Sequence, residues 1–211
     1  MNAPVSTAAP LPEIAQNASR TLATYVATLD SRKLPAEVVH AFRRVLLDYL
    51  TCAVAGSKMQ PTHIVLDYLQ SWDKATEACV VGMPVRLSAQ NAAFVNGTAT
   101  HGLDLDDGMT RGSVHPGGSV FPALLAMAEK LGSSAEDVIA AGVAAYDVTL
   151  RIASTVHPHS TRRGFHNTPT SGVFGAAAGA ARLLKLDAAT TLNALGLAGS
   201  FSGGLRAFLA D

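Results

Sequence analysis

The 211-residue sequence has little charge: only 15% of its residues are Asp, Glu, Lys or Arg, whereas globular proteins usually carry about 25%. The 16 basic residues balance the 16 acidic ones, which argues against a protein that binds nucleic acid electrostatically. At 48% hydrophobic residues and no net charge, the composition excludes a disordered chain. So low a proportion of charged residues is expected if another subunit covers part of the surface.

Cysteines and long apolar runs are scarce as well. The two cysteines, Cys52 and Cys79, cannot build a disulfide framework, and their apolar neighbours predict core positions in a protein of the reducing cytoplasm. No run reaches the roughly 18 uninterrupted apolar residues of a membrane helix, so we expect no membrane partner. Residues 1–10 lack the basic and apolar segments of a signal peptide. They predict a disordered tail before one domain at 11–211.

Apolar residues recur at steps of three and four along most of the chain, which predicts an all-α fold. Residues 78–81 are too short for a helix and predict a small strand or an extended linker. Helices that are rich in Ala and Gly close the chain, so that neighbouring backbones can approach closely. The expected helices cover 11–29, 35–56, 62–72, 88–101, 120–131, 133–153, 172–184 and 188–199.

Two polar loops, at 104–118 and 157–170, interrupt these helices. Five of the seven histidines fall between positions 101 and 166, in or beside these loops. Loops on a rigid helical scaffold often carry binding and catalytic groups. The two loops are therefore the first place to look for a functional site.

The first loop holds His101, Asp104, Asp106, Asp107 and His115. If the helix continues past His101, then His101 and Asp104 share a face, Asp104 and Asp107 share a face, and Asp106 points elsewhere. A carboxylate beside an imidazole can fix its tautomer and raise its basicity. Crowded carboxylates also raise one another's pKa, which suits a general acid. The alternative is a solvated acidic turn at a helix end.

A divalent metal is a further alternative for this loop, because Asp and His ligate several such ions. However, the segment DLDDG lacks the spacing of a calcium loop, and the sequence contains neither HExxH nor a pair of cysteine ligands. We therefore predict no metal.

The second loop is basic and contains His157, His159, Arg162, Arg163 and His166. Guanidinium groups present planar pairs of donors to carboxylates, so a small polyanionic substrate would suit this loop. Alternatively, the loop is a solvated turn that pairs with the acidic one. Arg162 and Arg163 are adjacent and cannot easily face one pocket together.

Four ordered segments resemble signatures of the MmgE/PrpD family. They are AAFVNGTATHGLDLDDG at 92–108, HPGGSVFPALLAMAE at 115–129, RGFHNTPTSGVFGAAAGAARLLKLD at 163–187 and NALGLAGSFSGGL at 193–205. Together they extend over nearly the whole chain, whereas one alone would be weak. The resemblance implies an all-α helical domain that forms a homodimer, carries a separate α+β lid domain, and uses neither an organic cofactor nor an iron–sulfur cluster.

The resemblance also implies chemistry on a small carboxylic acid, in which a proton next to a carboxylate is abstracted. It places the catalytic groups at Asp104, His115 and His166. The two histidines are expected to be acid and base, with the roles left open, and Asp104 to orient a histidine or act as the acid. Developing negative charge requires aimed donors, for which Arg162, Arg163 and the N–H groups near 117–118 are candidates. We also expect the following residues to bind substrate: His101, Asp107, Arg162 and Arg163.

The expected activity is that of a lyase of the 2-methylcitrate dehydratase type. An epimerase or decarboxylase of small di- or tricarboxylates is the alternative within the family. A non-catalytic, dimerising helical domain is the alternative of another class.

The sequence departs from the family pattern in two ways. Gly108 stands where many members have Thr, so a hydroxyl is missing and the substrate is expected to differ. The sequence also ends before the family's Lys-x-x-His-x-Gly segment and its lid domain, so we expect the helical domain to be incomplete.

Overall fold

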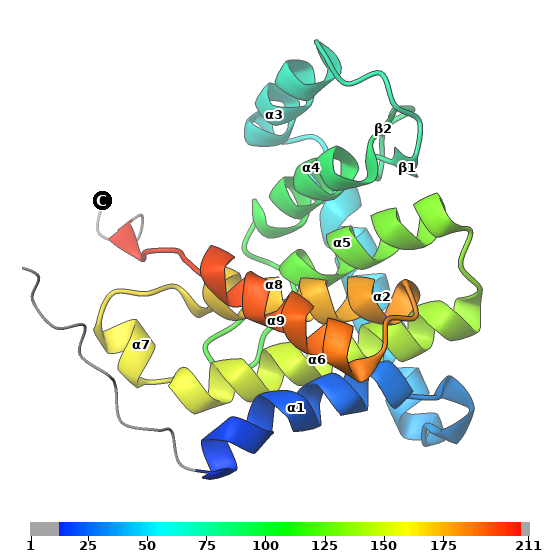
Figure 1. Ribbon diagram of the computed structural model, residues 1–211. Coiled ribbons are helices and arrows are strands. Elements are labelled where there is room, and N and C mark those ends of the chain that lie inside the picture. The colour runs from blue at the N-terminus through cyan, green and yellow to red at the C-terminus, as the bar shows by residue number, and fades with distance from the viewer. Residues whose placement is uncertain (1–12, 208–211) are drawn as a thin grey trace, which may run out of the picture.

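The computed structural model describes residues 13–207, and the predicted tail at 1–10 lies outside them. Within these residues the fold is all-α, as predicted, with nine α-helices and two short strands (Figure 1). The helices are α1 (Glu13–Thr28), α2 (Ala36–Gly56), α3 (Gln60–Gln70), α4 (Ala89–His101), α5 (Pro116–Leu131), α6 (Ala135–Val156), α7 (His159–Arg162), α8 (Asn167–Leu183) and α9 (Ala188–Phe201). A 3-10 turn covers Ser31–Lys33.

The main core forms where α8 packs against α5, α6 and α9. Small residues allow this close approach: a Cβ added at Gly175 of α8 would overlap the hydroxyl of Thr149 on α6. One helix of the described part, α6, is long and apolar enough to cross a membrane by length and composition alone. Its buried residues, Ala141, Ala145 and Val148 among them, face the protein interior, which is typical of a core helix.

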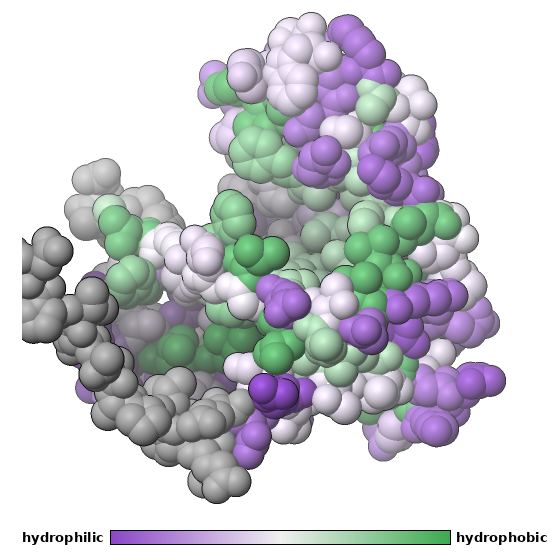
Figure 2. Space-filling view, in the orientation of Figure 1, coloured by the Kyte–Doolittle hydropathy of each residue, from purple (hydrophilic) through white to green (hydrophobic). Residues whose placement is uncertain are grey.

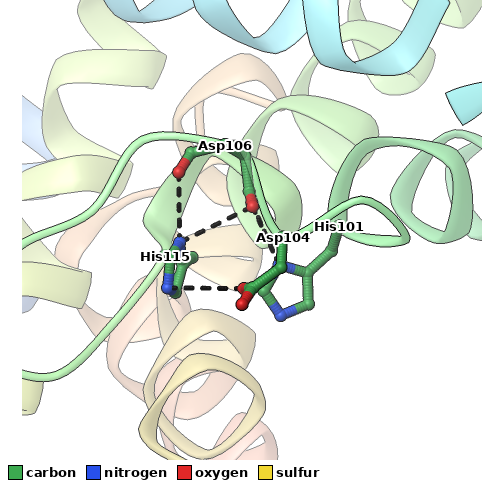
Figure 3. Close-up of side chains that lie close together, drawn as sticks. All are labelled: His101, Asp104, Asp106 and His115. Carbon is green, nitrogen blue, oxygen red and sulfur yellow. Dashed lines mark hydrogen bonds and ion pairs between the residues drawn. The ribbon is translucent and has the colours of Figure 1, made fainter. Parts of the chain in front are cut away.

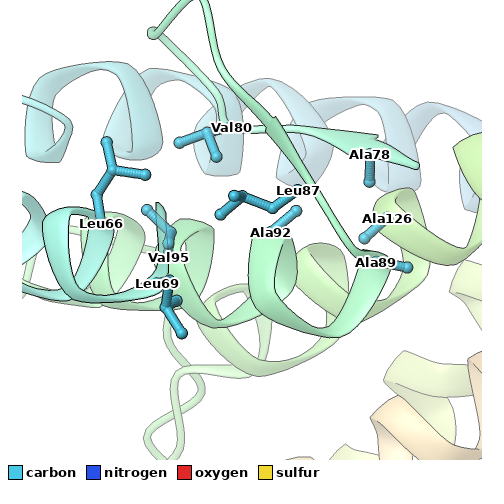
Figure 4. Close-up of a cluster of buried hydrophobic side chains, with 9 residues drawn as sticks. All are labelled: Leu66, Leu69, Ala78, Val80, Leu87, Ala89, Ala92, Val95 and Ala126. Atoms are coloured by element: carbon cyan, nitrogen blue, oxygen red, sulfur yellow. The ribbon is translucent and has the colours of Figure 1, made fainter. Parts of the chain in front are cut away.

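A second apolar cluster joins α3 and α4 to a hairpin (Figure 4). Strand β1 (Ala78–Cys79) lies in the segment predicted to be a strand or a linker, and it pairs antiparallel with β2 (Arg86–Leu87), which the sequence pattern did not reveal. The cluster consists of Leu66, Leu69, Ala78, Val80, Leu87, Ala89, Ala92, Val95 and Ala126. The cluster includes residues of α4, and α4 ends at His101.

Several helix starts differ from the prediction. Helix α3 begins at Gln60 rather than at 62, and Thr62 is buried inside it, where its hydroxyl donates a hydrogen bond to the carbonyl of Gly56. Helix α6 begins at Ala135 rather than at 133, and its cap is Ser134, whose hydroxyl accepts the N–H of Asp137. Cys79 is half-buried rather than a core residue.

Two helices begin earlier than predicted, and this shortens both polar loops. Helix α5 begins at Pro116, a position where the missing N–H of proline does no harm. Helix α8 begins at Asn167, and the short helix α7 lies within the predicted loop. As a result, His115 directly precedes the first residue of α5, and His166 directly precedes the first residue of α8.

Hydrophobic residues also reach the surface. In the view of Figure 2 they appear in the region of α5 and α9, bordered by hydrophilic side chains. On α9, Leu197 is 65% exposed and Phe201 is 79% exposed. The sparse charge of the sequence thus corresponds to a surface with many apolar side chains.

Candidate active site

The two polar loops meet where α5 and α8 begin. The buried Asn167 side chain donates a hydrogen bond of 2.7 Å to the carbonyl of Gly112. The hydroxyl of Thr168 accepts the backbone N–H of His115 at 3.1 Å. Because His115 and His166 directly precede α5 and α8, these bonds bring together two histidines that are far apart in the sequence.

Three imidazole rings gather at this junction. The ring of His101, at the end of α4, has its centroid 5.2 Å from that of His115 and 5.9 Å from that of His166. All three residues are half-buried, so they are packed by the protein and still reach solvent. Three of the residues predicted from the sequence therefore share one small site.

Asp106 lies at the base of this site, with a fully buried side chain. Its Oδ1 is 3.0 Å from Nδ1 of His101, and its backbone carbonyl oxygen is 3.1 Å from Nδ1 of His115 (Figure 3). The expectation that Asp106 points away from the histidines is wrong. It assumed a helix that continues past His101, whereas α4 ends there and Asp104 turns the chain with a left-handed φ of +52°.

Asp104 and Asp107 lie on different sides of the loop. Asp104 has a side chain that is 79% exposed, and its Oδ1 is 3.8 Å from Nε2 of His115. Asp107 instead accepts the N–H of Gly117 at 2.8 Å and the hydroxyl of Tyr146 at 3.2 Å. It also lines a cavity of about 350 Å³ whose walls are mainly apolar side chains of α2 and α6. The structure thus joins Asp104 to the imidazole cluster and turns Asp107 away from it.

The electrostatic environment separates the histidines. The hydrogen bond to Asp106 raises the pKa of His101 above its ordinary value of 6.5. Burial, followed by the charges of His101, His115 and Arg206, lowers the pKa of His166. The pKa of Asp107 is raised, chiefly by burial and with a contribution from Asp106, as expected for one of the crowded carboxylates. Neighbouring groups with diverging pKa values are typical of acid–base sites.

The predicted arginines are not engaged at this site. Arg162 and Arg163 are exposed, and within residues 13–207 neither guanidinium forms a hydrogen bond or an ion pair. Of the N–H groups predicted near 117–118 to meet substrate, that of Gly117 already donates to Asp107.

Arg206 is a cation near the cluster that no sequence pattern indicated. The segment after α9 returns to the second loop, where the His166 N–H donates to the carbonyl of Gly204 and the Arg206 N–H donates to that of Gly164. The positive charge of Arg206 acts on His166. No spacing in the sequence links these two positions, because only the return of the chain brings them together.

Four side chains could also approach one divalent ion. Donor atoms of His101, Asp104, Asp106 and His115 all lie within 4.8 Å of one another. Imidazole and carboxylate groups suit several such ions. Asp106 already accepts a hydrogen bond from His101, so an ion that used the same atoms would have to displace this contact. We therefore interpret the cluster first as an acid–base site.

A family model and several curated proteins are similar to this chain. The model of the MmgE/PrpD N-terminal domain matches residues 20–211. A cis-aconitate decarboxylase-like protein of Aspergillus oryzae is 29% identical over 90% of this chain and 41% of its own length. The cis-aconitate decarboxylase of Homo sapiens is 31% identical over 88% of this chain and 40% of its own length, and that of Mus musculus is 31% identical over 79% and 35%.

The chain spans about two fifths of the length of these curated relatives. The family model, in contrast, covers nearly all of the chain, including both polar loops and every histidine of the cluster. On this evidence the chain belongs to the MmgE/PrpD family and corresponds to its N-terminal domain.

Proposed function

We propose that this chain provides the acid–base site of a lyase that acts on a small di- or tricarboxylic acid. The observation that carries the proposal is the cluster of His101, His115 and His166 at three helix ends. The ring centroid of His101 lies 5.2 Å from that of His115 and 5.9 Å from that of His166. Within the cluster the pKa of His101 is raised and that of His166 is lowered, and such divergence between neighbouring groups is typical of acid–base sites.

The surroundings of the cluster favour an anionic substrate. Helices α5 and α8 both begin at the cluster, so their N-termini lie there. The N-terminus is the positive end of a helix dipole and attracts carboxylates. Arg206 adds a charge beside His166. Arg162 and Arg163 remain proposed substrate contacts that would have to turn toward the site.

Dehydration of a hydroxy-tricarboxylate of the 2-methylcitrate type is the specific reaction that we propose. One imidazole takes the proton from the carbon next to a carboxylate, the hydroxyl leaves with a proton from the acid, and an alkene and water are formed. His115 and His166 are the proposed partners, with Asp104 beside His115.

Decarboxylation is the second candidate, favoured by the relatives that are named cis-aconitate decarboxylases. There the bond between carbon and a carboxylate breaks, carbon dioxide leaves, and the carbon takes a proton from an imidazolium. The same pair of histidines would serve this reaction.

The assay offers 2-methylcitrate, citrate and cis-aconitate separately to the purified chain. Alkene formation is followed by ultraviolet absorbance, and carbon dioxide release is measured in parallel. Water loss from either hydroxy acid would support dehydration, and carbon dioxide from cis-aconitate would support decarboxylation. A folded chain that binds these acids in calorimetry and turns over none of them would instead favour the non-catalytic helical domain.

Homodimerisation is a second part of the proposal. Leu47 and Val54 on α2 and Phe94 on α4 are 65%, 49% and 59% exposed, and α2 and α4 pack side by side. Where exposed apolar side chains form a contiguous patch, the patch often marks a protein–protein interface. Sedimentation equilibrium measures the mass directly, and a monomer at micromolar concentration would contradict the proposal.

A further inference from the structure

Asp106 differs from the other acidic residues of the first loop. Its side chain is fully buried, whereas that of Asp104 is 79% exposed. A buried charge is stable only where it is paired or hydrogen-bonded. Asp106 satisfies this requirement with two imidazoles, since its Oδ1 lies 3.0 Å from Nδ1 of His101 and 3.5 Å from Nδ1 of His115.

The contact with His115 determines which ring nitrogen carries hydrogen. Nδ1 of His115 lies 3.1 Å from the backbone carbonyl oxygen of Asp106. A carbonyl oxygen only accepts, so Nδ1 must be the donor. In neutral His115 the lone pair therefore resides on Nε2, which faces the exposed carboxylate of Asp104 at 3.8 Å.

The contact with His101 leads to the same result. Both carboxylate oxygens of Asp106 lie near Nδ1 of His101, at 3.0 and 3.2 Å. An ionised carboxylate also only accepts, so Nδ1 of His101 carries hydrogen in the neutral ring as well as in the charged one. Figure 3 shows both rings turning one nitrogen toward Asp106 and the other away from it.

We infer that Asp106 is a positioning residue that fixes His101 and His115 together, in one tautomer, so that each presents Nε2 outward as the atom that exchanges protons. The side chain anchors His101, and the carbonyl of the same residue anchors His115. One buried residue thus sets the direction of two imidazoles. The inference rests on the proposed function only in assigning a purpose to the Nε2 atoms, since the tautomers themselves are independent of it.

Other charged groups face the same rings and contribute to their titration. Asp104 acts on His101, and the charges of His101, His115 and Arg206 act on His166. None of these contacts supplies an acceptor to Nδ1 of His101 in the described part of the chain, where Asp106 alone holds that atom. The tautomer therefore reports on Asp106 more specifically than a pKa does.

The first test uses the unmodified chain. Nitrogen-15 spectra of histidine-labelled protein, recorded above the histidine pKa values and assigned with His101→Gln and His115→Gln, distinguish protonation at Nδ1 from that at Nε2. We expect hydrogen on Nδ1 of both residues. Hydrogen on Nε2 of either neutral ring would overturn the inference, whether or not the chain turns over any acid.

The second test replaces Asp106 with leucine, which has a similar shape and suits a buried position. His101 loses its acceptor and should shift toward the Nε2-protonated form, whereas His115 keeps the backbone carbonyl and should not shift. Asp48→Asn is the matched control, because Asp48 holds the same loop through the N–H of Asp107 and contacts neither ring. An unchanged His101 tautomer in a folded D106L chain would overturn the inference.

A milder variant, Asp106→Asn, keeps the side chain's shape and removes its charge. We expect the pKa of His101 to fall in this variant, because the charge of its hydrogen-bond acceptor is removed. If the lyase activity is present, kcat should fall by about 10²- to 10⁴-fold, because His101 then no longer presents Nε2 in a fixed direction. An unchanged kcat would overturn the positioning role, whereas inactivity of the wild type together with the expected tautomers would contradict the proposed function alone.

Discussion

The hydroxyl of Tyr146, on α6, donates a hydrogen bond of 3.2 Å to Oδ2 of Asp107 in the first loop. Asp107 is held from two further helices, because its Oδ1 accepts the N–H of Gly117 on α5 and its own N–H donates to Asp48 on α2. Three helices therefore fix the segment that carries Asp104 and Asp106. The conformation of the candidate site therefore depends in part on contacts with these helices.

Removing the Tyr146 hydroxyl should destabilise the fold. Tyr146→Phe takes a donor from a half-buried carboxylate, and the loss of such a bond lowers the free energy of unfolding by roughly 1–3 kcal/mol. Urea denaturation measures this difference. Tyr68→Phe, at a residue 67% exposed on α3, is the control and should change little. Equal stability of the two variants would show that the anchor is unimportant.

Removing site groups should slow the proposed reaction without unfolding the protein. His166→Ala or Asp104→Asn is expected to lower turnover by about 10²- to 10⁴-fold, the range typical of a lost acid or base. Steady-state kinetics on a form of the protein that shows lyase activity provides the measurement. His63→Ala on the exposed face of α3 should leave turnover unchanged. Wild-type rates in the His166 and Asp104 variants would falsify their assignment.

Stability should depend on pH through His101. Its pKa is raised in the folded state, so protonation favours folding: this stabilisation is complete below the ordinary pKa of 6.5 and is lost as the pH rises through the higher folded value. The wild type should therefore exceed His101→Gln in free energy of unfolding by more at about pH 6 than at about pH 9. His166, whose pKa is lowered, has the opposite sign. A pH-independent difference between wild type and His101→Gln would contradict this linkage.

Two helical glycines should respond oppositely to alanine. A Cβ at Gly56 would overlap the carbonyl oxygen of Ala99, so Gly56→Ala forces α2 and α4 apart and should cost about 1–3 kcal/mol or more. Gly196 on α9 has nothing near its added Cβ, so Gly196→Ala should stabilise by about 0.5–1 kcal/mol. Thermal denaturation compares both with the wild type, and a stable Gly56→Ala variant would show that the two helices are not tightly packed.

Gly108 should influence substrate choice rather than folding. A Cβ there would lie 3.6 Å from Cε1 of the His115 ring, an ordinary contact distance. Gly108→Thr should therefore fold normally and place a hydroxyl near His115, changing the relative kcat/KM of competing carboxylic acids. Gly203→Thr, at a glycine whose added Cβ meets nothing, is the control. If the ratio stays constant for all the acids tested, the missing hydroxyl does not determine specificity.

Much of the fold was predictable from the sequence because apolar periodicity is a local signal. It located the helices around α2, α4, α6 and α9, and Gly132 ends α5 in the left-handed conformation for which glycine is suited. Helix starts were less predictable: Ser133 and Ser134 are equally good caps in the sequence, and only the bond from the Asp137 N–H distinguishes them. Strand β2 has two residues and no pattern of its own.

The candidate site was predictable in its residue types but not in its geometry. The concentration of histidines in two polar loops indicated five candidates, and the family resemblance selected His115 and His166 among them. The roles of Asp106 and Arg206 depend on chain reversals, at Asp104 and after α9, that no local pattern encodes. Asp107 and Asp104 look alike in the sequence, yet burial separates them.

The sequence by itself thus determined the helical class, the two polar loops and the family, because each depends on residue order along a short stretch. Tertiary structure decided which carboxylate faces which imidazole. Hydrogen-bond partners such as His115 and Thr168, or Tyr146 and Asp107, lie 53 and 39 residues apart, and only the packing of α5, α6 and α8 brings them within bonding distance.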